Sequence, residues 1–148
     1  MTETRTIFFD MDGTIADLYG VENWLECLIN SNPMPYEMAK PMLRLSTLAR
    51  YLNKLQKCGF RIGIISWLSK SGTEEYNTEV TEVKLAWLAK HLPSVQFDEI
   101  NIVRYGTPKY EFAHTFNDIL FDDEIGNRAN WLGQAYSEED IIAVLKSL

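Results

Sequence analysis

Short apolar runs alternate along the chain with longer amphipathic stretches, and this alternation limits the fold more than any other feature of the sequence. The runs are rich in Ile, Val and Phe without strict polar–apolar alternation, as expected for strands that are buried on both faces. Strands are predicted at residues 6–9, 61–65, 99–103, 119–121 and 134–136. Strands separated by helices indicate a three-layer, Rossmann-like α/β fold, with a parallel sheet and helices on both of its faces.

The stretches between these strands show helical periodicity. A stripe of leucines over residues 45–55 is followed by Gly59, which is a typical stop signal. A second apolar stripe covers residues 80–91 and ends before Pro93. Ser137 and the acidic residues after it are typical of the start of a helix, so we expect the last helix to begin there. We expect all of these stripes to pack in the core.

The length and charge of the chain limit its organisation and its partners. With 148 residues and no repeat or linker-like segment, one domain over residues 1–148 is the simplest organisation. The net charge of -7 argues against broad binding to nucleic acid or to an anionic membrane, because both need a cationic surface. No apolar run approaches the ~20 residues that span a bilayer, so we expect no membrane segment.

The two cysteines and the N-terminal residues indicate the cellular compartment of the protein. Cys27 and Cys58 have no metal-ligand spacing and fit reduced thiols. No basic segment with a following apolar stretch and cleavage site comes after Met1, so we expect no signal peptide. Together these features predict a cytoplasmic protein.

Residues 17–42 fit the alternating pattern less well. This segment carries three prolines and several aromatic side chains, and it is too long for a turn and too short for a second domain. We expect a small, partly helical insertion that covers the site. Its aromatic residues Tyr19, Trp24 and Tyr36 have two interpretations. They stack on a nucleobase, which is worth about 1–3 kcal/mol per base where measured, or they form the small hydrophobic core of the insertion.

Two carboxylates directly follow the first predicted strand, in the run Asp-Met-Asp-Gly-Thr at residues 10–14. Ligands of open parallel sheets collect at the carboxyl ends of the strands. An extended backbone would place Asp10 and Asp12 on one side of the chain, and Gly13 permits a sharp turn after them. Carboxylates this close repel each other unless a cation or a shared proton is present. A calcium loop does not fit, because no further ligands follow at alternating positions.

The ends of the other predicted strands carry groups that complement these carboxylates. Ser66 follows the second strand, where its hydroxyl donates to a phosphate oxygen or caps a turn. Lys109 follows the third, where it neutralises a carboxylate and a phosphoryl group or remains a solvated surface residue. Asp122 and Asp123 follow the fourth strand, with Asn127 nearby, and hard oxygen ligands suit Mg²⁺. Each signal is weak alone, but their order along the chain is specific.

In residue types and in order, these four segments resemble the motifs of the haloacid dehalogenase-like hydrolase superfamily, and together they span nearly the whole chain. The resemblance implies that Asp10 is the nucleophile and a metal ligand. It implies that Asp12 is the general acid and base, and that the backbone carbonyl of Asp12 also binds the metal. An acidic residue at this second position is associated with phosphatases, whereas dehalogenating relatives lack it.

The same resemblance implies roles for the later segments. Ser66 and Lys109 would hold the phosphoryl group, and Asp122, helped by Asp123, would complete a Mg²⁺ site. Residues 17–42 would form a minimal helical cap. His91 and His114 have no partner ligands at useful spacing, so we expect both to be structural.

Residues 10–18 further resemble the start of the 5'(3')-deoxyribonucleotidases, although the insertion here is shorter. By this resemblance Lys70, four residues after Ser66, would reach a substrate anion. We therefore expect a magnesium-dependent phosphomonoester hydrolase with an aspartyl-phosphate intermediate, acting on a nucleoside monophosphate or another small phosphomonoester. The alternatives are a phosphatase of polynucleotide ends or proteins with an open site, and a catalytically idle phosphate-binding module of the same fold.

Overall fold

Among residues 4–148, which the computed structural model describes, five parallel strands form the central sheet. The strands lie in the order β5-β4-β1-β6-β7, and each neighbouring pair is parallel. They are β1 (Thr6–Phe9), β4 (Arg61–Trp67), β5 (Glu99–Val103), β6 (Ile119–Phe121) and β7 (Gln134–Tyr136). All five predicted strands are confirmed, and β4 continues beyond its predicted end to include Ser66 and Trp67. The expectation about a signal peptide falls partly on residues 1–3, outside the described residues.

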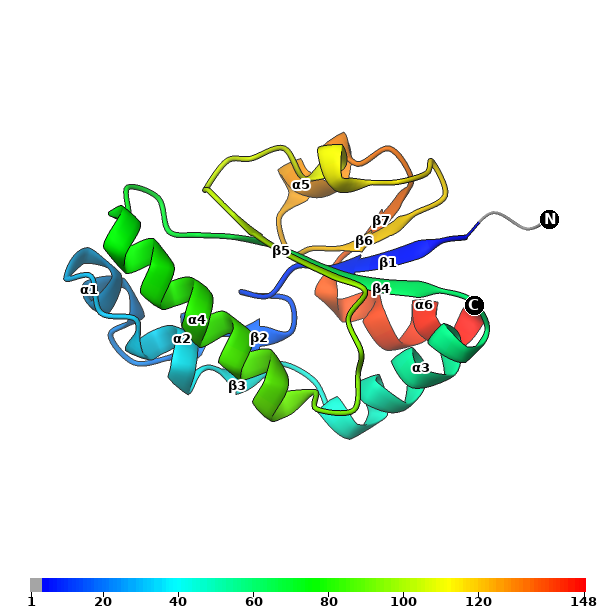
Figure 1. The fold of residues 1–148 in the computed structure, drawn as a ribbon, viewed down its shortest axis with the longest axis horizontal. Helices are drawn as coiled ribbons and strands as arrows, with labels where there is room; N and C mark the ends of the chain where they lie inside the picture. Colours follow the sequence, from blue (N-terminus) through cyan, green and yellow to red (C-terminus); the bar gives the residue numbers. More distant parts are fainter. Residues whose placement is uncertain (1–3) are drawn as a thin grey trace.

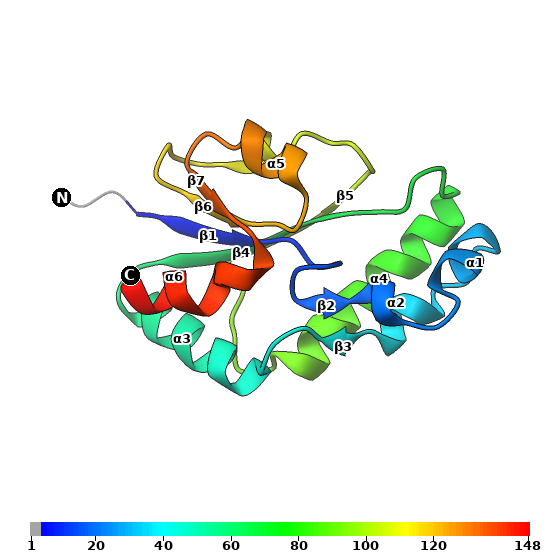
Figure 2. The same cartoon turned by 180° about the vertical axis from the view of Figure 1, so that it is seen from behind.

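Helices lie on both faces of this sheet and in the insertion that follows β1 (Figures 1 and 2). They are α1 (Trp24–Ile29), α2 (Met34–Met38), α3 (Leu45–Lys57), α4 (Glu74–His91), α5 (Ile125–Asn130) and α6 (Ile141–Ser147). In Figures 1 and 2, α5 lies on one side of the sheet, and α3 and α6 lie together on the other. The three-layer α/β architecture predicted from the sequence is therefore confirmed.

The core is divided by the alternation of side chains along β1. Ile7 and Phe9 point to one face and pack in a cluster that includes leucines of α3 and α6, whereas Phe8 packs on the other face with Leu120 and Trp131. All three β1 side chains are at most 1% exposed. A strand that is apolar on both faces can be buried only between two layers of helices, which is why this short run specifies the centre of the sheet.

The order of the strands determines where a ligand site can form. From β1 the chain moves to β4 and β5 on one side, then returns to β6 and β7 on the other side of β1. The connection after β1 therefore leads toward one edge of the sheet, and the connection into β6 leads back toward the other edge. Where the direction changes, at the switch point between β1 and β6, a crevice opens beyond the carboxyl ends of the strands. The backbone N–H of Asp10 still donates to the carbonyl of Phe121 at 2.9 Å, so the first residue after β1 lies beside the end of β6.

Residues 17–42 form an insertion that begins and ends at a two-stranded antiparallel ribbon. The ribbon pairs β2 (Ala16–Asp17) with β3 (Lys40–Pro41), and a 3₁₀ turn (Leu18–Gly20), α1 and α2 lie between them. The insertion packs on α4, where the indole N–H of Trp87 donates to the carbonyl of Ala39 at 2.8 Å. In Figure 2 the insertion and α4 lie side by side.

Some helix boundaries differ from the prediction. Helix α4 begins at Glu74, before the apolar stripe, because the Thr73 side chain accepts a hydrogen bond from the N–H of Tyr76 and caps it. The last helix begins at Ile141, since Ser137 precedes a 3₁₀ turn (Glu138–Asp140) and its side chain makes no capping hydrogen bond. Helix α5 was not predicted, because none of its residues is buried and it therefore carries no apolar stripe.

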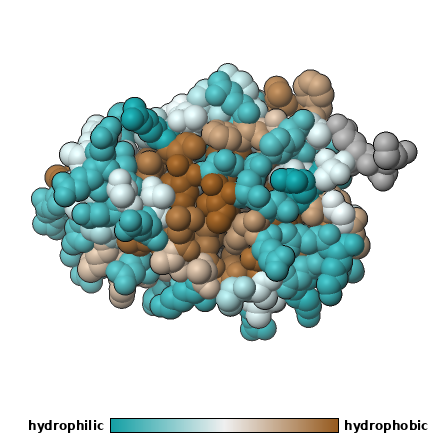
Figure 3. Space-filling model, in the orientation of Figure 1, coloured by the Kyte–Doolittle hydropathy of each residue, from teal (hydrophilic) through white to brown (hydrophobic). Residues whose placement is uncertain are grey.

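One part of the surface is apolar. In Figure 3 hydrophobic side chains gather near the middle of the face shown, in the region of α4 and β5. A pocket of about 350 Å³ there is lined by Leu85, Leu88, Ala89, Leu92, Pro93, Val95, Phe97 and Ile100.

Within the described part of the chain, no helix combines the length and the hydropathy needed to cross a membrane.

Candidate active site

A second pocket, of about 510 Å³, opens at the carboxyl ends of β1, β4, β5 and β6. Six of the seven side chains predicted for the site line it: Asp10, Asp12, Lys70, Lys109, Asp122 and Asp123. The seventh, Ser66, is not among the lining residues and is fully buried. The fold thus brings together residues that are more than 100 positions apart in the sequence, such as Asp10 and Asp122.

Lys109 joins the ends of β1 and β6. It lies in a 3₁₀ turn (Lys109–Phe112) after β5, and its Nζ is 2.9 Å from Oδ1 of Asp10 and 2.7 Å from Oδ2 of Asp122. All three side chains are less than 10% exposed. Burial alone would lower the pKa of Lys109, but the charges of Asp10 and Asp122 raise it above its usual value. Lys109 therefore carries a positive charge against these two carboxylates.

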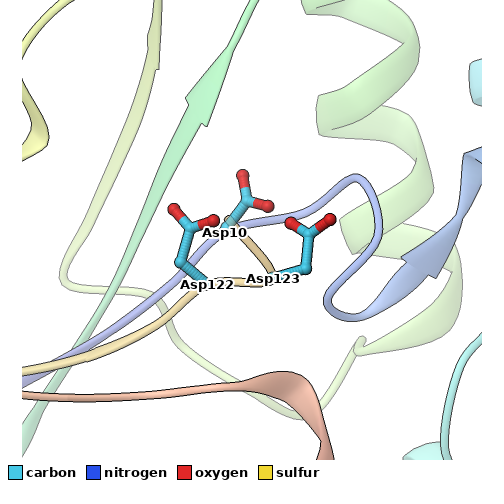
Figure 4. A group of neighbouring side chains, drawn as sticks. All are labelled: Asp10, Asp122 and Asp123. Carbon is cyan, nitrogen blue, oxygen red and sulfur yellow. The ribbon is translucent and has the colours of Figure 1, made fainter. Parts of the chain in front are cut away.

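Asp10, Asp122 and Asp123 form a compact carboxylate cluster. One oxygen from each lies within 4.8 Å of the others, and Figure 4 shows the three carboxylates pointing to the same side. Burial, followed by the charge of Asp10, raises the pKa of Asp122 to about 6 and that of Asp123 to about 8. Burial and repulsion between the carboxylates thus both disfavour the ionised forms, and a cation in the cluster would offset the repulsion. Three hard oxygen ligands with excess negative charge fit Mg²⁺.

Thr14 connects the two acidic segments, a role that the sequence analysis did not assign. Its hydroxyl donates to Oδ2 of Asp10 at 3.1 Å and accepts from the backbone N–H of Asp123 at 3.1 Å. The expected sharp turn precedes it, with Gly13 at φ 81°. A Cβ at position 13 would collide with the Asp123 side chain, so glycine is required there both for its conformation and for space.

Asp12 is paired with a different lysine, Lys84, which the sequence analysis also missed. Nζ of Lys84 lies 3.0 Å from Oδ2 of Asp12, 2.7 Å from Oγ of Ser66 and 2.7 Å from the carbonyl oxygen of Trp67. Ser66 therefore contacts the lysine that binds Asp12 and is separated from the pocket wall. Its role as a phosphate ligand stays a prediction. Burial raises the pKa of Asp12, while the charge of Lys84 opposes this shift.

The sequence did contain a signal for Lys84. It lies four residues after Val80 and three before Trp87, both of which are buried, so helical periodicity places it on the buried face of α4. A lysine on that face needs an acidic or polar partner. What the sequence could not supply was the identity of the partner, Asp12, which is 72 positions away.

Aromatic side chains form much of the remaining pocket lining. Tyr19 and Trp24 from the insertion make an edge-on contact with ring centroids 4.9 Å apart, and Trp67 and Tyr105 lie 5.0 Å apart. Tyr36 lies at the edge of the pocket but is only 4% exposed and packs in the core that the insertion shares with α4. Tyr36 therefore fits the interpretation as core of the insertion, and the stacking of Tyr19 and Trp24 on a base stays a prediction. Nζ of Lys70 is 6.0 Å from the ring centroid of Tyr105.

Comparisons with known proteins identify the fold. No family model matches the sequence, and no curated protein matches it. Among solved structures, the D,D-heptose 1,7-bisphosphate phosphatase from Burkholderia thailandensis is similar, with a TM-score of 0.60, 10% sequence identity and 97% of each chain covered. At this identity the likeness establishes the fold alone. The fold is the one implied by the resemblance to haloacid dehalogenase-like hydrolases, and that expectation is confirmed.

Proposed function

We propose that the protein is a magnesium-dependent phosphomonoester hydrolase that forms a phosphorylated Asp10 and acts on small phosphomonoesters such as nucleoside monophosphates. One observation carries the proposal: two carboxylates at the end of the central strand face one pocket, and each is paired with its own buried lysine. Asp10 is paired with Lys109 and Asp12 with Lys84. Separate environments for two neighbouring carboxylates support separate chemical roles. The fold shared with a solved phosphatase supports the same class of reaction.

In the first half of the proposed reaction, a carboxylate oxygen of Asp10 attacks the phosphorus atom of the ester. A bond forms between this oxygen and phosphorus, and the bond between phosphorus and the ester oxygen breaks. The electron pair of the broken bond leaves with the ester oxygen, which takes a proton from Asp12. The pKa of Asp12, which burial raises, suits a carboxyl group that must hold a proton until this step.

In the second half, water replaces the leaving alcohol. Asp12, now ionised, accepts a proton from the water as its oxygen attacks phosphorus. The bond between phosphorus and the Asp10 oxygen breaks, and its electron pair returns to the carboxylate. Inorganic phosphate leaves, Asp12 is again protonated and Asp10 is free. Lys109, held beside Asp10, opposes the negative charge that gathers around the phosphoryl group in both halves.

The carboxylate cluster defined above would hold the magnesium ion. The proposed ligands are Asp10, Asp122, Asp123 and the backbone carbonyl of Asp12. When bound, the ion would offset the negative charge of the pocket and of the phosphoryl group. Without such a cation, the pocket would repel a phosphate dianion, because acidic side chains outnumber lysines in its lining. The acidic residues are Asp10, Asp12, Asp122, Asp123 and Glu124, and the lysines are Lys70 and Lys109.

The lining of the pocket supports a substrate with a flat apolar part. Tyr19 and Trp24 offer ring faces and edges on the insertion, and Trp67 and Tyr105 do so at the ends of β4 and β5. A base would stack on such rings, whereas a sugar phosphate without a base gains less from them. Lys70, beside Tyr105, adds a cation for a second anionic group. These features favour nucleoside monophosphates over the sugar bisphosphate in the structural neighbour's name.

Hydrolysis assays test the proposal directly. The wild type, Asp10→Asn and the control variant Asp140→Asn, whose side chain is exposed and outside the pocket, are compared on an aryl phosphate and on panels of nucleoside and sugar monophosphates. We expect turnover that requires added Mg²⁺, stops in Asp10→Asn, remains in Asp140→Asn and is fastest on nucleotides. Equal rates in the wild type and Asp10→Asn would refute the mechanism. Equal, poor turnover of all nucleotides would refute the substrate class.

A further inference from the structure

We propose that Lys84 is a positioning residue of this reaction, which holds the Asp12 carboxylate in the pocket through an anchor at the end of β4. The inference rests on the proposed function, since it assigns Lys84 its effect through the general acid and base. It adds a residue from α4, an element outside the four segments from which the site was predicted.

The hydrogen bonds of Lys84 account for all of its donors. A lysine ammonium group has three N–H donors and no acceptor. Two of them go to the last two residues of β4, the Ser66 hydroxyl oxygen and the Trp67 carbonyl oxygen, each at 2.7 Å. The third goes to Oδ2 of Asp12 at 3.0 Å. The ammonium group is therefore held at two points of a central strand and directs its remaining donor at one carboxylate oxygen.

Burial makes this arrangement specific. Lys84 is 1% exposed, whereas the Asp12 side chain keeps 14% of its surface exposed toward the pocket. The ring of Tyr36, from the insertion, covers the ammonium group with its centroid 5.1 Å from Nζ. Enclosing a lysine costs free energy that an apolar pair of similar size would not. The lysine is thus better explained by what it does to Asp12 than by stability alone.

The two buried lysines of the pocket divide the carboxylates between them. Lys109 contacts Asp10 and Asp122, and among the carboxylates of residues 4–148 Lys84 contacts Asp12 alone. Lys109 therefore does not replace Lys84 as the partner of Asp12. A general acid must lie within about 2.6–3.2 Å of the atom that it protonates, so a carboxylate released from Lys84 would lose this alignment.

The test compares two esters that differ in their need for the general acid. The leaving group of an alkyl phosphate is a strongly basic alkoxide that needs the proton from Asp12, whereas the nitrophenolate of nitrophenyl phosphate is a good leaving group that needs it much less. In Lys84→Met we expect kcat/KM, which reports the steps up to transfer of the phosphoryl group to Asp10, to fall by about 10–100-fold on the alkyl ester and clearly less on the aryl ester. Lys90→Met is the matched control, because Lys90 is an exposed lysine of the same helix.

A double-mutant cycle shows whether Lys84 acts through Asp12. We expect Asp12→Asn to show the same preference for the aryl ester, and the combined variant to be no slower than Asp12→Asn alone. Ser66→Ala removes one of the two hydrogen bonds that hold Lys84 to β4. We expect a smaller fall in kcat/KM than in Lys84→Met, again larger on the alkyl ester than on the aryl ester. Ser66→Ala also keeps the proposal testable if Lys84→Met does not fold, which thermal unfolding reveals.

The outcomes separate the two proposals. If the wild type is active and Asp10→Asn is not, but Lys84→Met or Ser66→Ala lowers kcat/KM equally for both esters, the role of Lys84 is refuted and the proposed function stands. A further fall when Lys84→Met is added to Asp12→Asn also refutes it. A wild type that hydrolyses neither of these esters nor any of the nucleoside and sugar monophosphates refutes both proposals together.

Discussion

At the residue scale, the site is built from side chains that each serve two partners. Lys109 bridges Asp10 and Asp122, and Thr14 bridges Asp10 and the backbone of Asp123. Both bridges connect the segment after β1 to the segment after β6. The end of a strand leaves its last side chains without neighbours from the sheet, so such cross-links are what hold the carboxylates in a fixed arrangement.

Replacing Thr14 by Val tests this cross-link. Valine has nearly the same shape as threonine but no hydroxyl, so the backbone N–H of Asp123 would be left without its acceptor. We expect a loss of about 1–3 kcal/mol in the free energy of unfolding, measured by urea titration, and weaker binding of Mg²⁺. Thr14→Ser keeps the hydroxyl and is the control. Equal stability of Thr14→Val and the wild type would contradict the structural role.

At the element scale, α4 supports both the insertion and the catalytic carboxylate. Trp87 binds the end of α2 through the Ala39 carbonyl, and Lys84, one turn earlier, binds Asp12. The helix is stabilised at both ends: Thr73 caps its N-terminus, acidic residues occupy the first turn, and Lys90 and His91 lie in the last turn. The position of α4 thus couples the cover of the pocket to its chemistry.

The cap of α4 can be weakened without touching the pocket. Thr73→Ala removes the acceptor for the N–H of Tyr76, and we expect a loss of about 1 kcal/mol in the free energy of unfolding. Thr73→Ser retains the hydroxyl and should be close to the wild type. Urea unfolding followed by circular dichroism measures both variants. A loss of the same size in Thr73→Ser would show that the cap is not the cause.

At the scale of the whole molecule, the strand order concentrates negative charge at one edge of the sheet. The switch point brings the residues that follow β1 and β6 together, and both segments are acidic. Because these carboxyl groups are buried and lie beside one another, the folded state holds their protons more tightly than the unfolded chain does. The consequence is a stability that depends on pH and on the metal.

The sign of this dependence follows from the pKa values. In the folded protein the pKa of Asp122 is raised from 3.8 to about 6 and that of Asp123 to about 8. Between these limits the folded state binds more protons than the unfolded state, so the contribution of these groups to the free energy of unfolding falls as pH rises from 3.8 to about 8. Bound Mg²⁺ competes with these protons. We expect Mg²⁺ to raise the melting temperature more near pH 8 than near pH 5.

Thermal unfolding with and without Mg²⁺ across this pH range measures the effect. Asp123→Asn removes the group with the higher of the two pKa values, so the pH dependence of the metal-free protein should become shallower and the effect of Mg²⁺ smaller. A metal-free protein whose stability increases between pH 6 and about 8 would contradict the prediction.

The parts of the fold that could be predicted are those that local sequence encodes. Residues 6–9 and 119–121 are apolar throughout, and such short runs have few alternatives to a buried strand. Helix α5 and the start of the last helix were missed or misplaced, because short helices without an apolar face leave no periodic signal. The same reasoning predicted that Asp10, Asp12, Lys109, Asp122 and Asp123 would lie together, since each follows a predicted strand or lies close to its end.

The sequence by itself determined the α/β class of the fold, the strands, and a pocket with paired carboxylates at their carboxyl ends, because these depend on periodicity and on the order of segments. Only the tertiary structure decided how the charges are paired: Lys84 with Asp12, Lys109 between Asp10 and Asp122, and Ser66 behind the pocket and not on its wall. Those pairings depend on distances between residues far apart in the chain, and such distances exist only once the sheet, α4 and the insertion have packed together.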